Sequence, residues 1–264
     1  MWHSLIRLAQ HRVLIETLVV RELKARYRGT VLGFLWTFIH PLMLLGVYTF
    51  VFMFVFKPAR GDNVDPYALY LFCGLLPWTW FASSLSEGAN SLVANGNLIK
   101  KIIFPAEVLP VVAVLSNGVN FLLGLPIYLG FWLAFRPEGI SVHILLLPIV
   151  LLIQVVLSLG LVMFLSALTV HYRDVRDLLA NVLTLWFFGS PIIYPLDLIA
   201  HPTARAVLEF NPMTHIIEGY HATIFVGELI HWKRLGVTGI LALLVLVAGY
   251  YFFDRLRDSF AEEV

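Results

Sequence analysis

The side chains that could do chemistry in this sequence are few, and no familiar catalytic motif gathers them. Its 264 residues include 18 Lys and Arg, 17 Asp and Glu, 9 His and 1 Cys. The sequence lacks the phosphate-binding pattern G-x-x-x-x-G-K-[ST], the zinc pattern H-E-x-x-H and the nucleophile pattern G-x-S-x-G. The single cysteine, Cys73, excludes an internal disulfide and a multi-cysteine metal site. We therefore expect no catalytic residue, no metal and no cofactor bound by this chain, and any transport would draw its energy from another chain.

Isolated ionisable residues are the remaining candidates for acid–base chemistry. They are His40, Glu87, Glu218 and His221. An intramembrane glycosyl or acyl transferase would need such groups to converge at one membrane depth, whereas these are scattered over both sides of the topology derived below. Turnover of a lipid-linked sugar by the purified chain alone would support this alternative.

Two polar loops are candidate docking sites for a partner. Residues 95–110, NGNLIKKIIFPAEVLP, favour a turn at Asn-Gly and carry two adjacent lysines. Residues 171–179, HYRDVRDLL, repeat an Arg-Asp pair three positions on, which gives a compact charged face on one helical turn. The alternative interpretation of each is a solvated, charge-balanced loop.

Apolar runs without Asp, Glu, Lys or Arg must position these groups. Hydrophobic residues make up 59% of the chain and charged residues 13%, which is typical of a polytopic membrane protein. The runs are residues 31–56, 67–86, 108–135, 144–170, 178–196 and 235–253. The first would form a helix of roughly 39 Å, enough to cross a bilayer core of about 30 Å. We predict an all-α polytopic membrane protein with six transmembrane helices in a single domain, residues 1–264.

The distribution of Lys and Arg predicts the orientation. If the N-terminus is cytoplasmic, the inner segments hold 12 Lys and Arg and the outer segments hold 6. Because basic residues flanking a span stay cytoplasmic, both termini are expected inside, including the tail at 254–264.

The segments that flank the runs also have helical patterns. Residues 1–30 alternate apolar and basic groups, which predicts an amphipathic helix on the cytoplasmic surface, with a disordered basic tail as the alternative. In residues 197–234, Asn211 followed by Pro212 is a good helix start, and apolar residues then recur at helical spacing. We expect short re-entrant helices on the outer side, with a soluble hairpin as the alternative.

Together these features resemble one family, the membrane subunit of ATP-binding-cassette exporters of cell-surface polysaccharide such as O-antigen, capsule or teichoic acid. The resemblance rests on LKARYRGTVLGFLWTFIHP at 23–41, NLIKKIIFPAEVLP at 97–110, YRDVRDLL at 172–179, WFFGSPIIYPL at 186–196 and FNPMTHIIEGYH at 210–221. These stretches occur in the family's order across nearly the whole chain. His221 stands where members more often carry Arg.

The resemblance implies a homodimer in the bacterial cytoplasmic membrane, with ATP and Mg held by two separate ATPase subunits. It implies ATPase coupling by Asn97, Lys100, Lys101, Phe104 and Pro105. It implies a cytoplasmic entrance at Tyr172, Arg173, Asp174, Arg176 and Asp177. The outer re-entrant segment would include Asn211, Pro212, Glu218 and His221.

The resemblance also gives the aromatic residues a role, because aromatic faces can meet the apolar faces of sugar rings without one fixed hydrogen-bond pattern. The candidates for the wall of a polysaccharide conduit are Phe34, Trp36, Phe38, Trp186, Phe187 and Phe188. Packing and an interfacial aromatic belt are the alternative. A permease of the same architecture that exports drugs or free lipids remains the nearest competing function.

Overall fold

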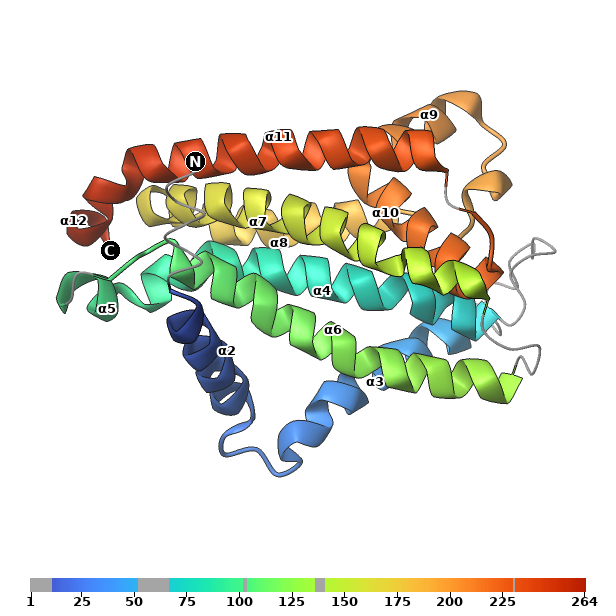
Figure 1. The fold of residues 1–264 in the computed structure, drawn as a ribbon, viewed down its shortest axis with the longest axis horizontal. Helices are drawn as coiled ribbons and strands as arrows, with labels where there is room; N and C mark the ends of the chain where they lie inside the picture. The colour runs from blue at the N-terminus through green and yellow to red at the C-terminus, as the bar shows by residue number, and fades with distance from the viewer. Residues whose placement is uncertain (1–10, 52–66, 102–103, 136–140, 230) are drawn as a thin grey trace.

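The computed structural model describes residues 11–51, 67–101, 104–135, 141–229 and 231–264. All regular structure in these ranges is helical, as predicted. Five helices form the body, with α4 against α6, α7 and α8, and α7 against α11 (Figure 1). They are α4 (Tyr67–Ala94), α6 (Val108–Phe135), α7 (Leu147–His171), α8 (Val175–Phe188) and α11 (Trp232–Leu256).

Within these ranges, four helical segments are long and apolar enough to cross a membrane. They are Tyr67–Ala94, Val108–Phe135, Val142–His171 and Trp232–Ser259. The third joins the short helix η3 (Val142–Leu146) to α7. These segments coincide with the second, third, fourth and sixth predicted runs, so the chain is a multi-pass membrane protein.

The first and fifth runs are helical over only part of their length. In the first, η1 (Gly33–Leu35) leads into α3 (Trp36–Phe50), and residues 52–66 lie outside the described part of the chain. In the fifth, α8 has 14 residues, about 21 Å of helix, which is shorter than a bilayer core. It stops at Gly189, and Pro191 cannot continue a helical hydrogen-bond ladder. Residues 189–195 are turns and loop beside the first turns of α4, where the Tyr67 hydroxyl donates to the Ile193 carbonyl at 2.9 Å.

The segment before the first run contains a helix, α2 (Arg12–Tyr27), whereas residues 1–10 of the predicted amphipathic helix lie outside the described part, and its place on the cytoplasmic surface stays a prediction. Its apolar side chains pack on the start of α6, where Leu18 is buried against Val108 and Val112. Gly29 and Gly33 both adopt positive φ, of 78° and 51°, which side chains with a Cβ rarely do. These glycines make the turn that leads from α2 into α3, the V at the lower edge of Figure 1.

The two ends of the body carry different small helices (Figure 1). The α9 end holds η4 (Leu196–Leu198), α9 (Pro202–Phe210), α10 (Pro212–Tyr220) and η5 (His221–Val226). The α5 end holds α5 (Gly96–Lys101), η6 (Arg257–Ser259) and α12 (Phe260–Glu263). Pro212 is the first residue of α10 and Asn211 caps it, accepting a hydrogen bond from the Met213 N–H at 2.9 Å, so that helix start is confirmed.

Small residues let the long helices approach closely. A side chain at Gly249 of α11 would collide with the Gly160 carbonyl of α7, and one at Gly160 would meet the backbone of residues 245 and 246. In lipid, where apolar burial does not drive helices together, such close packing is a main source of helix association.

Candidate functional site

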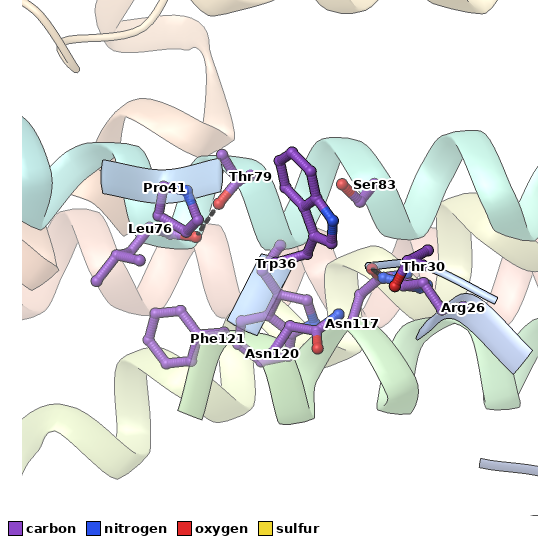
Figure 2. Close-up of a pocket in the computed structure, with 11 residues that line it drawn as sticks. Arg26, Thr30, Trp36, Pro41, Leu76, Thr79, Ser83, Asn117, Asn120 and Phe121 are labelled. Atoms are coloured by element: carbon purple, nitrogen blue, oxygen red, sulfur yellow. Dashed lines mark hydrogen bonds between the residues drawn. The ribbon is translucent and has the colours of Figure 1, made fainter. Parts of the chain in front are cut away.

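A cavity of about 410 Å³ lies between α2, α3, α4 and α6. Figure 2 shows polar side chains on its walls: Arg26, Thr30, Ser83, Asn117 and Asn120. Aromatic rings from three helices also line it: Trp36, Trp80 and Phe121. The Trp80 and Phe121 rings stack with centroids 5.0 Å apart, so the two rings together form an aromatic wall of the cavity. Such a cavity can offer both ring faces and hydrogen-bonding groups to one ligand.

One wall of the cavity is held by a charged network that joins three helices. Arg26 Nη2 of α2 donates to Glu87 Oε2 of α4 at 2.6 Å, and Arg26 Nη1 donates to Asn117 Oδ1 of α6 at 3.1 Å. Asn117 Nδ2 in turn donates to the same Glu87 oxygen at 2.6 Å. Because the donors share one carboxylate oxygen, each contact supports the orientation of the others. The network fastens α2, and with it the start of α3, to the body of the protein.

Of the conduit candidates in the first run, Trp36 lies where a ligand could reach it. Its side chain is 41% exposed and lines the cavity of Figure 2. Phe38, two residues further along α3, is half-buried. The side chain of Phe34 lies outside the described part of the chain.

The three adjacent aromatics of α8 have three different surroundings. Phe187 is 7% exposed and packs on Trp78 with ring centroids 5.7 Å apart. Trp186 packs edge-on against Phe81 and donates its indole N–H to Asn211 Oδ1 at 2.8 Å. Phe188 is 56% exposed. Only Phe188 therefore presents most of its ring to the outside.

A second cavity, of about 270 Å³, runs between α3, α4 and α8. It is lined by Leu44, Leu75, Trp78, Thr79, Leu183, Thr184, Phe187 and Phe188. Thr79 lines this cavity and the first one, so the two flank the same turn of α4. Leu44 of α3 and one side of α8, from the buried Leu183 to the exposed Phe188, thus border an apolar groove with few polar groups.

The predicted coupling residues gather around α5. Asn97 and Lys100 are exposed on this helix, while Phe104 and Pro105 are half-buried behind it. The side chain of Lys101 lies outside the described part of the chain. Phe104 packs against the cluster of apolar side chains from α4, α6, α7 and α11 that underlies α5. Two polar residues thus face outward, and Phe104 connects the loop to the core.

The predicted entrance residues lie on the turn between α7 and α8 and on the first turn of α8. All of them, Tyr172, Arg173, Asp174, Arg176 and Asp177, are exposed. Arg176 and Asp177 form an ion pair at 3.6 Å, and such exposed pairs add little stability. The repeated charges therefore form a solvated surface, free to meet a partner or a ligand.

Asn211 connects the end of α8 to the start of α10. Besides capping α10, its Nδ2 donates to the Gly189 carbonyl at 2.7 Å and to Ser190 Oγ at 2.9 Å. With the bond from Trp186, all the polar groups of the Asn211 amide are used. The residue therefore fixes the place where the fifth run stops being helical.

His221 and Glu218 face different neighbours. His221 is buried, stacks on Tyr70 with ring centroids 4.0 Å apart, and its Nε2 lies 3.1 Å from the Tyr70 carbonyl. Glu218 is half-buried and its Oε2 lies 3.5 Å from Nδ1 of His215. Glu218 and His221 are therefore not a pair, and His221 packs against Tyr70 of α4.

Sequence reasoning missed a buried hydrogen-bond chain. Gln154 of α7 donates to the Pro77 carbonyl at 2.9 Å and accepts from the Tyr220 hydroxyl at 2.6 Å. A glutamine inside an apolar run was the available signal, since a polar group in lipid needs a partner. Arg26 was also missed, because nothing local separates it from the other basic residues near it.

Among the described residues, no three His, Cys, Asp or Glu side chains converge to hold a metal.

The chain is similar to known proteins over most of its length. The sequence pattern of the ABC-2 type transporter family matches residues 13–225. The chain is 38% identical over 258 residues, 97% of each chain, to an O-antigen export system permease protein of Myxococcus xanthus. It is 29% identical over 252 residues to a protein of the same description from Klebsiella pneumoniae, covering 94% of this chain and 95% of that one. It is 23% identical over 249 residues, again 94% and 95%, to a polysialic acid transport protein of Escherichia coli.

Proposed function

The chain belongs to the ABC-2 type transporter family as a membrane subunit, and we propose that it is the permease of an exporter for a lipid-linked cell-surface polysaccharide. The observation that carries the proposal is its 38% identity, over 97% of both chains, to an O-antigen export permease. The family match covers a membrane transport component, and the 264 residues contain no ATP-binding loop. ATP and Mg are therefore assigned to a separate ATP-binding-cassette partner.

In this proposal the α3 and α8 face is one half of the conduit, and a second copy supplies the other half. The face is apolar and uncovered: Met43, Val47, Leu185 and Phe188 are between 56% and 74% exposed. Trp36 and Phe188 would offer ring faces to passing sugars, while Phe187 supports the wall from within. Many weak stacking contacts suit a polymer that must slide.

The cavity of Figure 2 would take sugar rings or the polar head of the lipid carrier. It offers three aromatic side chains together with hydroxyl and amide groups, and Arg26 supplies a guanidinium at its rim. This combination of ring faces and polar groups suits a glycan better than a simple hydrocarbon chain, which has no polar rim to meet the hydroxyl and amide groups.

The proposed topology has six crossings with both termini cytoplasmic. The crossings are the four long helices, the first run through α3, and the fifth run as a helix followed by the loop at 189–195. The α5 end would then be cytoplasmic, where Lys100 and Arg173 can meet the ATPase and the substrate. Helices α9 and α10 would form the outer re-entrant segment, in which α10 packs among α4, α7 and α11.

Deletion of the gene in its host tests the proposal. We expect loss of the surface glycan and accumulation of the lipid-linked polymer in the cytoplasm, with both reversed by the wild-type gene. Normal surface glycan combined with greater drug sensitivity would instead support a drug or lipid exporter. Turnover of lipid-linked sugar by the purified chain would support an enzyme.

A further inference from the structure

The segment that follows α11 folds back against the proposed coupling helix. Residues Arg257–Val264, here called the return segment, comprise η6, α12 and Val264. Figure 1 shows α12 and the C-terminus at the same end as α5, and α12 contacts both α5 and α7. Sequence patterns indicated only a cytoplasmic tail here.

Phe260 anchors the return segment in the protein. Its side chain is fully buried, with the ring centroid 5.1 Å from that of Phe253 and 6.4 Å from that of His171. It belongs to an apolar cluster that also includes Ile99 of α5 and Phe104 of the loop behind it. The same cluster therefore holds both the return segment and the coupling region.

Polar contacts fix the rest of the segment. Ser259 Oγ lies 3.2 Å from His171 Nε2 at the end of α7. Arg257 Nη2 lies 3.7 Å from Glu107 Oε2, and Glu107 is only 1% exposed, with neither carboxylate oxygen hydrogen-bonded within the described residues. A buried carboxylate is costly without a nearby opposite charge, so Arg257 is held close to Glu107. Glu107 stands three residues after Phe104, in the loop at 104–107 that leads into α6.

The far end of the segment leaves no space at α5. A Cβ placed on Gly96 would clash with the Val264 side chain, and it would lie 3.4 Å from Val264 Cβ. Gly96 is the first residue of α5. The return segment thus contacts the first residue of α5 through Val264. It contacts the loop between α5 and α6 through Arg257, which lies close to Glu107.

We propose that the return segment is a positioning element for ATPase coupling: it holds α5 rigidly on the ends of α6 and α7, so that movement of the ATPase reaches the spans. This inference rests on the proposed function, because it assigns α5 to the contact with the ATPase. Without the segment, the cluster beneath α5 would lose Phe260, and α5 would move independently of the spans.

A cysteine pair tests the geometry. In a Cys73→Ala background, Gly96→Cys and Val264→Cys place two Cβ atoms near the usual disulfide separation of about 3.8 Å. We expect oxidation to cross-link the pair in membranes. The cross-linked complex with its ATPase should keep export, because the return segment is proposed to stay in contact with α5 throughout transport. Failure to cross-link, or loss of export that returns on reduction, would overturn the proposal.

Phe260→Ala tests the coupling role. In the complex with its ATPase we expect hydrolysis to persist while export per ATP falls by about tenfold, the equivalent of about 1.4 kcal/mol of lost coupling. Phe260→Leu should retain most coupling. Tyr251→Ala is the matched control, because that ring on α11 is 66% exposed and should leave coupling unchanged.

Rescue separates positioning from general damage. If the Gly96→Cys and Val264→Cys cross-link restores coupling in Phe260→Ala, the segment acts by holding α5, whereas a formed cross-link without rescue would refute this. If Phe260→Ala does not accumulate, Arg257→Ala serves in its place. Cross-linking of Asn97→Cys to the ATPase reports the same positioning without any substrate, so a wrong glycan assignment would not affect that result.

Discussion

The packed half of this protein, α4, α6, α7 and α11, differs sharply from the open half, α3 and α8. In the most apolar stretch of α4, 78% of residues are buried. In α8 the buried side chains are Leu179, Leu183 and Phe187, a single stripe, and no described side chain of α3 is buried. Helix α4 is therefore mostly covered within the chain. The segments Val142–His171 and Trp232–Ser259 bury only 33% and 22% of their most apolar stretches, as suits helices with one face toward lipid, whereas α3 and α8 present a separate apolar surface. In the proposed exporter that surface meets a second copy and the moving glycan.

A bulky residue at the tightest contact of the packed half should have the largest effect. Gly249→Val would force α11 away from the α7 backbone, since its side chain has no space beside the Gly160 carbonyl. We expect a loss of roughly 3 kcal/mol or more and almost no monodisperse protein in detergent. Gly236→Val is the matched control on the same helix, because a Cβ there has no neighbour within 4 Å. Equal yields of the two variants would contradict the close approach.

Adjacent aromatics on α8 compare the buried face of this helix with its exposed face directly. Phe187→Ala removes a buried ring and should destabilise the protein by about 3 kcal/mol. Phe188→Ala removes an exposed ring and should change stability by only about 0.5 kcal/mol, yet reduce export. Thermal unfolding in detergent together with surface-glycan assays would check both. If Phe188→Ala were the more destabilising, the assignment of the two faces would be wrong.

The smallest expected effect is a pH response confined to α9. No described side chain of α9 is buried, and charges help to hold it: Glu209 pairs with Arg205 at 3.1 Å and with Arg234 at 3.3 Å. The hydrogen bond from Arg205 lowers the pKa of Glu209 from its ordinary value of 4.5. Its contribution is therefore present above that value and lost as the pH falls through the lowered pKa.

Hydrogen exchange would detect this response. We expect α9 to lose protection in acid while α4 and α7 keep theirs, and Glu209→Gln to show weak protection of α9 at neutral pH with little further change. Acid-induced exposure of α7 before α9 would contradict the contrast between a charge-held helix and a packed body.

The sequence predicted the parts of the fold that depend on local pattern. Long apolar runs gave four of the spans, and Asn211 with Pro212 marked the start of α10. The end of α8 at Gly189 was missed, because the run stays apolar while Gly189, Pro191 and the distant Asn211 stop the helix. Contacts such as Arg26 with Glu87 join residues 61 positions apart, and no local pattern encodes them.

The candidate site was likewise predictable where it depends on residue type and not where it depends on long-range contacts. Charged loops and exposed aromatics could be nominated from residue type, but which ring faces outward depends on packing. Phe187 and Phe188 are neighbours in the chain, and only their contacts separate them. The return segment had no signal beyond one phenylalanine in a charged tail.

Reconstitution into liposomes tests the central claim, that this chain forms a passive pathway driven from outside. Proteoliposomes containing the chain with its ATP-binding-cassette partner should move the lipid-linked polysaccharide across the bilayer when ATP is supplied. Those containing the chain alone should not. ATP-independent uphill movement by the chain alone, or hydrolysis of ATP without the partner, would contradict the account.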